Sequence, residues 1–209
     1  MSEQNILPIK ARYKSASVGE FIQSVVHRAQ SLFEKNQDFL RLSPHDRSSL
    51  LRTKASYVAC LSFHLILREV HLMEHPIFLQ SLMLLFGPTA TQLGERISSQ
   101  VDCDPIITKL ILAIVSFSTI TFAIYNHEHS GNLTNMKNIL RIQETYTELL
   151  WRYLLYKYNH QHAVIRFANM IRCLFSVQDA VASVIEAQYV SDIIASLVRQ
   201  TELALVVSH

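Results

Sequence analysis

A scarcity of helix-breaking residues is the feature that most constrains how this chain can fold. Its 209 residues include only 4 glycines and 5 prolines, and these are the residues that most often interrupt a helix. No stretch shows the strict alternation of apolar and polar residues that is typical of a half-buried strand. Apolar residues recur at helical spacing instead, so the sequence predicts an all-α protein.

The composition indicates one globular domain. Hydrophobic residues make up 49% of the chain and charged residues 17%, and a chain of this length can bury its own core. We expect residues 1–17 to be a flexible lead and residues 18–209 to form the domain. The formal net charge is +2 and no basic block occurs, so we expect no direct contact with nucleic acid. The first residues lack the apolar segment of a signal peptide.

The three cysteines do not suggest a metal site. Cys60, Cys103 and Cys173 are far apart and form neither a CxxC pair nor a zinc-finger spacing. Each has apolar neighbours, so we expect three buried, unreactive thiols in a reducing compartment. We expect no metal and no cofactor.

Periodicity and helix-ending residues together outline the helices. Pro76 and the pair Gly87-Pro88 interrupt apolar runs. The helix over residues 44–73 is apolar on most sides, which favours a central, buried position. The predicted helices cover residues 18–42, 44–73, 77–86, 89–100, 106–124, 136–158 and 166–190.

The segment from residue 33 to residue 52 is the most informative. Within it, Ser43 is a good helix cap, Pro44 suits the first turn, and Asp46 favours the positive end of a helix. The spacing of the whole segment resembles the signature of the nuclear receptor ligand-binding domain. The matching residues are Phe33, Lys35, Phe39, Leu42, Asp46, Leu50, Leu51 and Arg52.

Two positions in this segment depart from the family pattern, because Glu34 replaces an alanine and Arg47 replaces a glutamine. A second stretch adds to the resemblance. From Arg166 to His209 the chain is similar to the retinoid X receptor pattern without a gap. The residues that match in type there are Arg166, Phe167, Ala168, Leu174, Glu186, Thr201 and Leu203.

The resemblance implies a three-layered antiparallel helical sandwich. It also implies a module for transcription regulation that acts by binding rather than catalysis. We expect such a module in the nucleus, with the cytoplasm as the alternative. No DNA-binding domain is expected in this chain.

A surface groove for coregulators is the first site that the resemblance implies. In the family, a helical LxxLL peptide docks there between a lysine and a glutamate. The corresponding groove residues are Lys35, Arg47, Ser48, Leu51, Arg52 and Leu203. Leu205 stands at the glutamate position, with Glu202 three residues earlier, and a leucine cannot accept hydrogen bonds from peptide amides. We therefore expect weak coactivator binding, and we favour a corepressor or the chain's own C-terminal segment as the occupant.

A pocket for a small lipophilic ligand is the second implied site. By position, its residues are Gln23, Val26, Ala29, Ala59, Cys60, Phe63, Val184 and Ala187. Most are apolar or small, as a lipid pocket requires, although a filled core has the same composition. Ile66 stands at the family's ligand-anchoring arginine, so an acidic ligand held at that position is not expected.

A dimer contact is the third implied site. The family dimerises through its tenth helix, and the corresponding residues are Arg166, Met170, Leu174, Val177 and Val181. Such a stripe supports a homodimer or a heterodimer, but it is also typical of a core-facing side. Ile107 stands at a glutamate of the family's dimer-class salt bridges, which leaves the class of dimer open.

Three other interpretations remain. Residues 106–124 are long and apolar enough for a single membrane span, but Lys109 interrupts them and no positive cluster flanks them, so we favour a buried helix. His71, Glu74 and His75 fit the HxxEH motif of a zinc hydrolase, with a third ligand from Glu144 or Glu148. Pro76 disfavours this motif because it pushes the preceding residue out of a helix. The third interpretation is a helical adaptor that needs no ligand.

Overall fold

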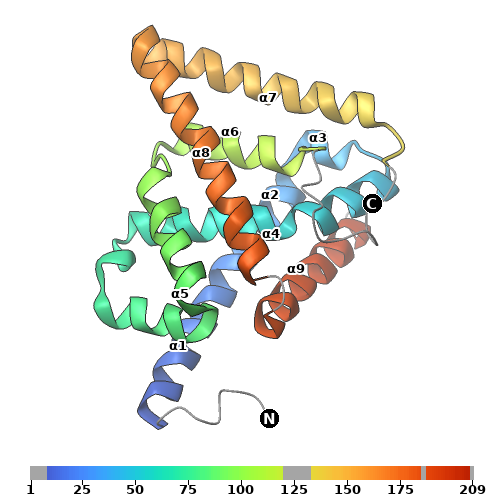
Figure 1. Ribbon diagram of the computed structural model, residues 1–209. Coiled ribbons are helices and arrows are strands. Elements are labelled where there is room, and N and C mark those ends of the chain that lie inside the picture. The colour runs from blue at the N-terminus through green and yellow to red at the C-terminus, as the bar shows by residue number, and fades with distance from the viewer. Residues whose placement is uncertain (1–8, 120–132, 185–186, 208–209) are drawn as a thin grey trace.

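The computed structural model describes residues 9–119, 133–184 and 187–207. In these residues all regular elements are helices, so the all-α prediction is confirmed (Figure 1). The α-helices are α1 (Ile9–Arg28), α2 (Gln30–Lys35), α3 (Gln37–Leu40), α4 (Pro44–Glu69), α5 (Pro76–Gln100), α6 (Pro105–Ser116), α7 (Met136–Lys157), α8 (His160–Val184) and α9 (Gln188–Val207), and η2 (Leu72–Glu74) is a 3-10 turn.

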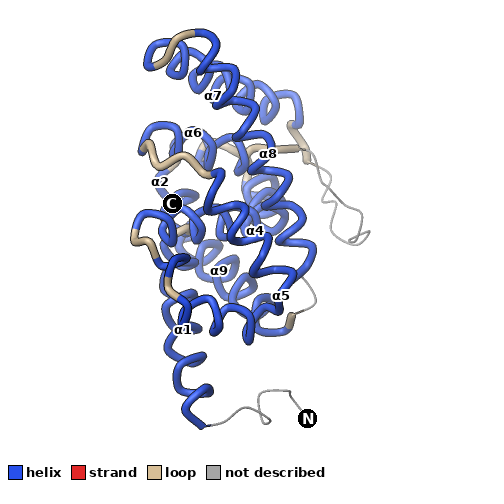
Figure 2. The backbone as a smooth tube through the Cα atoms, turned by 60° about the vertical axis from the view of Figure 1, so that its left-hand side comes forward, coloured by secondary structure: helices blue, strands red, loops and turns tan. Residues whose placement is uncertain are grey.

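Helix α4 is the centre of the molecule. It packs against α1, α5, α6, α8 and α9, and it lies among the other helices in Figure 2. Its first turn follows the predicted pattern, because the Asp46 amide donates a hydrogen bond to the Ser43 hydroxyl at 3.1 Å and Pro44 is the first helical residue. Helix α6 packs between α4 and α7, which extends the stack above α4 (Figure 1).

The N-terminal region differs from the prediction. Helix α1 begins at Ile9, so residues 9–17, which we expected to be a flexible lead, are helical. The single helix expected over residues 18–42 is three helices. Asn36 has extended backbone angles, and its side chain accepts a hydrogen bond from the Phe39 amide at 3.0 Å. Asparagine competes with the helix for backbone donors, so it starts a new helix here.

The two helices expected over residues 77–86 and 89–100 are the arms of one bent helix, α5. Gly87, at the bend, has a φ of 82°, a backbone conformation that glycine adopts far more readily than other residues. The next residue, Pro88, supplies no backbone donor. The predicted break is therefore present as a kink.

The apolar stretch at residues 106–124 is shorter as a helix than expected. Helix α6 ends at Ser116, and residues 120–124 lie outside the described part of the chain. Among the described helices, none meets the length and composition of a membrane span by itself. Only α8 and α9 do so, as a pair bent by 113°.

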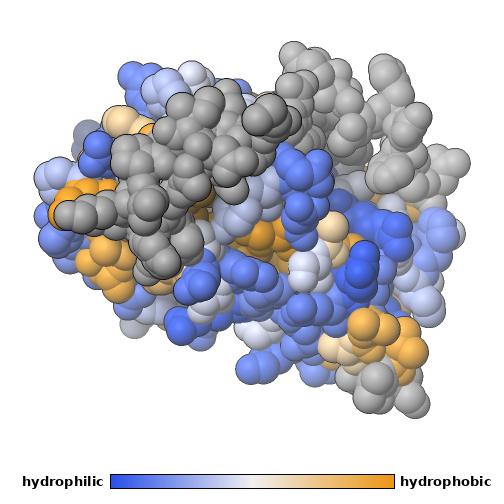
Figure 3. Space-filling view, turned by 90° about the horizontal axis from the view of Figure 1, so that it is seen from below, coloured by the Kyte–Doolittle hydropathy of each residue, from blue (hydrophilic) through white to orange (hydrophobic). Residues whose placement is uncertain are grey.

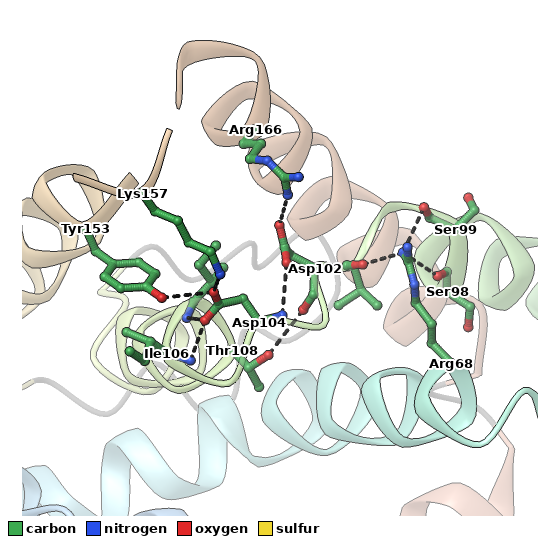
Figure 4. Close-up of polar contacts among 12 residues, drawn as sticks. Arg68, Ser98, Ser99, Asp102, Asp104, Ile106, Thr108, Tyr153, Lys157 and Arg166 are labelled. Atoms are coloured by element: carbon green, nitrogen blue, oxygen red, sulfur yellow. Dashed lines mark hydrogen bonds and ion pairs between the residues drawn. The ribbon is translucent and has the colours of Figure 1, made fainter. Parts of the chain in front are cut away.

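A polar cluster fixes the turn between α5 and α6 (Figure 4). Asp104 caps α6, because its carboxylate accepts hydrogen bonds from the backbone amides of Ile106 at 2.8 Å and Ile107 at 3.2 Å. The same carboxylate accepts a hydrogen bond from the Tyr153 hydroxyl at 2.9 Å and pairs with Lys157. One aspartate therefore joins α6 to α7.

Two arginines attach the same turn to α8 and α4. Asp102 pairs with Arg166 of α8. Arg68 of α4 donates a hydrogen bond to the carbonyl oxygen of Ser98 at 3.0 Å and another to that of Val101. As a result, α4, α7 and α8 all meet α5 and α6 at this turn (Figure 4).

Candidate functional site

A largely apolar cavity of about 510 Å³ lies between α1, α4, α5, α8 and α9. This volume is within the range of small-molecule binding sites. The view from below, where α1 and α9 lie, shows apolar side chains between hydrophilic ones (Figure 3). Five of the predicted pocket residues line the cavity: Val26, Ala59, Cys60, Phe63 and Val184.

The other three predicted pocket residues lie outside the cavity wall. Gln23 is exposed, because α1 turns its neighbour Ile22 toward the cavity. Ala29 is buried at the junction of α1 and α2, and Ala187 lies between α8 and α9. A positional match to a family cannot resolve these local rotations of the chain.

Polar residues of the wall were missed by the sequence analysis. Lys54 is 4% exposed, and burial lowers its pKa to about 8. Its ammonium group lies 5.8 Å from the centre of the Tyr57 ring. A lysine and a histidine on the inner face of a helix are rare enough to be a usable signal, although the sequence does not indicate what they face.

His64 is the second such residue. It is 6% exposed, and its Nδ1 lies 3.1 Å from the Ser98 hydroxyl oxygen. Burial lowers the pKa of His64 to about 4, so the ring is neutral at physiological pH. Gly94 of α5 faces the ring closely, since a Cβ added there would lie 2.7 Å from His64 Cε1.

At the predicted coregulator groove, the end of α9 lies beside the first turns of α4 (Figure 1). The Ser48 hydroxyl donates a hydrogen bond to Glu202 Oε1 at 2.7 Å. Arg52 donates two more to the same carboxylate, at 2.9 and 3.2 Å. Burial acts to raise the pKa of Glu202, but these contacts outweigh it and lower the pKa. Two predicted groove residues thus hold the chain's own last helix.

The remaining groove residues divide between surface and core. Lys35, in the last turn of α2, is exposed, and Leu203 is 62% exposed. Arg47 and Leu51 are buried in the core rather than on the groove surface, because the inner face of α4 includes their positions. Leu205, in the last turn of α9, is also buried.

The predicted dimer stripe of α8 faces inward. Met170, Val177 and Val181 are buried, and α8 packs against α5. Leu174 is half-buried, and Arg166 pairs with Asp102. Periodicity identified a buried side of the helix, not a contact surface. The exposed apolar residues of α8 include Val164, Ile171 and Phe175.

The HxxEH motif does not form one helical face. His71, which precedes the 3-10 turn η2, has a left-handed φ of 55°, and His75, which follows that turn, is extended. His71 Nδ1 lies 3.1 Å from Glu74 Oε1, and all three side chains are exposed. Within the described residues, no group of three or more His, Cys, Asp or Glu side chains is placed to hold a metal.

The cysteines are partly as expected. Burial raises the pKa of Cys60 to about 12 and that of Cys173 to about 11, so both thiols stay protonated. By exposed surface only Cys173 is buried as predicted, whereas Cys60 is half-buried and Cys103 is exposed. Cys103 lies in the turn between Asp102 and Asp104, whose carboxylates face α7 and α8.

No model of a known protein family matches the chain, and no curated protein matches it either.

Proposed function

We propose that the chain is a ligand- and coregulator-binding module of the nuclear receptor type. In this proposal the helices form a three-layered sandwich around α4, and the module regulates transcription in the nucleus by binding rather than catalysis. The observation that carries the proposal is the cavity, because five residues named by the resemblance line it. The packing of α4 between α6 and the α1–α9 side supports the layered arrangement.

The ligand in this proposal is a small lipophilic molecule. The wall is formed mainly by aliphatic and aromatic side chains from five helices, including Ile22, Leu82, Phe86 and Ile194. Burying apolar surface contributes roughly 25 cal/mol for each Å², so such a wall favours a ligand with few polar groups.

The coregulator surface in this proposal is closed at rest by α9. A peptide of the LxxLL or corepressor type has to displace the contacts of Glu202 with Ser48 and Arg52 before it reaches α4. The peptide is then held at its other end by Lys35. Competition of this kind is a second reason, beside the loss of one clamp residue, to expect weak coactivator binding.

Native mass spectrometry tests the ligand proposal. We expect the purified chain to carry an additional mass that is lost on denaturation. Ala195→Trp should remove this mass, because Ala195 lines the cavity from α9. Ala168→Trp is the matched control, since Ala168 is an exposed alanine on α8 that does not line the cavity. The ligand proposal fails if the wild-type chain has its bare mass and takes up no lipophilic probe.

The exposed apolar residues of α8 favour a second candidate, a ligand-independent adaptor that dimerises through this helix. Ile171 is 42% exposed and Phe175 is 54% exposed. A doubled mass with no small molecule bound, restored to a single mass by Phe175→Asp, would support this candidate. A monomer with a bound ligand would reject it.

A further inference from the structure

A ring nitrogen of His64, in the cavity wall, has no hydrogen-bond partner among the described residues. His64 lines the cavity and is 6% exposed. Its Nδ1 is engaged by Ser98 at 3.1 Å, whereas no described residue bonds to Nε2. Nε2 is not one of the fully buried atoms that lack a partner, so its cost in the empty cavity is small, but a ligand atom that bonds to it adds a hydrogen bond and gains affinity.

The position of the ring is fixed from both sides. Ser98 holds one nitrogen, and Gly94 leaves just enough room for the ring against α5, since a Cβ there would be 2.7 Å from His64 Cε1. A ring held in this way presents Nε2 in one direction. Such preorganisation favours recognition of one polar group in the ligand.

Several of the other polar groups of the wall already have partners. The hydroxyls of Ser56, Tyr57 and Ser191 have none among the described residues, but no contact fixes their direction as Ser98 fixes the His64 ring. The Thr91 hydroxyl donates a hydrogen bond to the Gly87 carbonyl oxygen at 2.9 Å, and Arg52 pairs with Glu202. Lys54 lies near the Tyr57 ring and has a further contact within the protein. Lys54 is also about 15 Å from His64 along α4, since each residue of a helix adds about 1.5 Å.

We infer that the ligand is an uncharged, mainly apolar alcohol whose hydroxyl group bonds to His64 Nε2; this inference rests on the proposed ligand-binding function. A hydroxyl group fits both tautomers of the ring, because it both donates and accepts hydrogen bonds. A carboxylate fits less well, because a neutral imidazole gives it no opposite charge. The apolar part of the ligand then extends along α4 past Phe63 and Ala59.

Displacement of the neutral dye Nile red from the full chain tests this inference. The competitors are cetyl alcohol, palmitic acid and hexadecane, which share one chain length. We expect the alcohol to bind about tenfold more tightly than the alkane, which corresponds to one buried hydrogen bond. Equal binding of alcohol and alkane would overturn the inference and leave the ligand-binding function standing. Failure of every competitor to bind would overturn both the alcohol inference and the proposed ligand-binding function.

Variants identify the anchoring residue. His64→Phe should abolish the preference, so that the alcohol and hexadecane bind equally, whereas His64→Gln should retain part of the preference. Val198→Ala is the matched control, because Val198 lines the cavity from α9 and should weaken both competitors equally. The inference is also overturned if palmitic acid binds best and Lys54→Met removes its advantage. The ligand series on the wild-type chain needs no variant to fold.

Discussion

At the scale of single residues, the contact between His64 and Gly94 decides the shape of one end of the cavity. The ring is buried and bonded to Ser98, so it cannot swing away to make room. Glycine within a helix costs about 0.5–1 kcal/mol relative to alanine. Glycine is nevertheless favoured at position 94, because the Cβ of any other residue would clash with the His64 ring.

Gly94→Ala should therefore lower the free energy of unfolding by about 1–3 kcal/mol, the usual cost of overpacking a core. Urea denaturation measures this change. In a His64→Ala background the sign should reverse, because the space is then open and alanine favours the helix. A loss of the same size in both backgrounds would show that the ring is not the obstacle.

The contact between His64 and Gly94 could be predicted from the sequence only in part. Lys54 and His64 are visible as polar residues in the apolar run of residues 44–73. Ser98 and Gly94 are not recognisable as their neighbours, because that contact depends on where α5 crosses α4. Local spacing carries no information about such a crossing.

At the scale of elements, periodicity predicted the existence of the long helices better than their breaks. Helix α7 lies within one residue of the predicted range 136–158. The breaks before α2 and α3 were missed, because an apolar stripe continues across them from Val25 to Phe39. The face that a helix turns inward was also ambiguous, as the stripe of α8 shows.

Helix α9 is the element whose position bears most on the coregulator proposal. Glu202→Gln removes the ion pair with Arg52, and the end of α9 should then leave α4 more often. We expect a corepressor or LxxLL peptide to bind up to about fivefold more tightly, because a half-exposed ion pair contributes about 1 kcal/mol or less. Fluorescence anisotropy of a labelled peptide measures this.

Gln200→Ala is the matched control for this prediction, because Gln200 is exposed on the same helix. It should leave peptide affinity unchanged. Lys35→Glu tests the other end of the groove. Unchanged affinity for an LxxLL peptide in that variant would show that the clamp assignment is wrong.

At the scale of the whole molecule, the turn between α5 and α6 links these two helices to α4, α7 and α8 through a few charged side chains (Figure 4). Asp104-Pro105 was readable in the sequence as a helix start. The partners of Asp104 on α7 could not be identified from the sequence, because Tyr153 lies 49 positions further along the chain. The stability of the fold should therefore depend on the ionisation of this turn.

The pKa of Asp104 gives the pH range of that dependence. Burial acts to raise this pKa, but hydrogen bonds from Lys157 and from the amides of Ile107 and Ile106 outweigh it and lower the pKa from 3.8 to about 2. Below pH 3.8 the Asp104 carboxylate is protonated in the unfolded chain, whereas in the folded chain it stays ionised until the pH approaches about 2. The contribution of Asp104 is thus complete above pH 3.8 and is lost as the pH falls toward about 2.

Asp104→Asn should accordingly flatten the loss of stability over this range, since asparagine still caps α6 but does not titrate. Urea midpoints measured at a series of pH values for both proteins give the difference. Glu148→Gln is the control, because the pair of Glu148 with Arg152 is exposed and contributes little. If Asp104→Asn keeps the acid slope of the wild-type protein, the loss of stability at low pH does not come from this carboxylate and its contacts between α6 and α7.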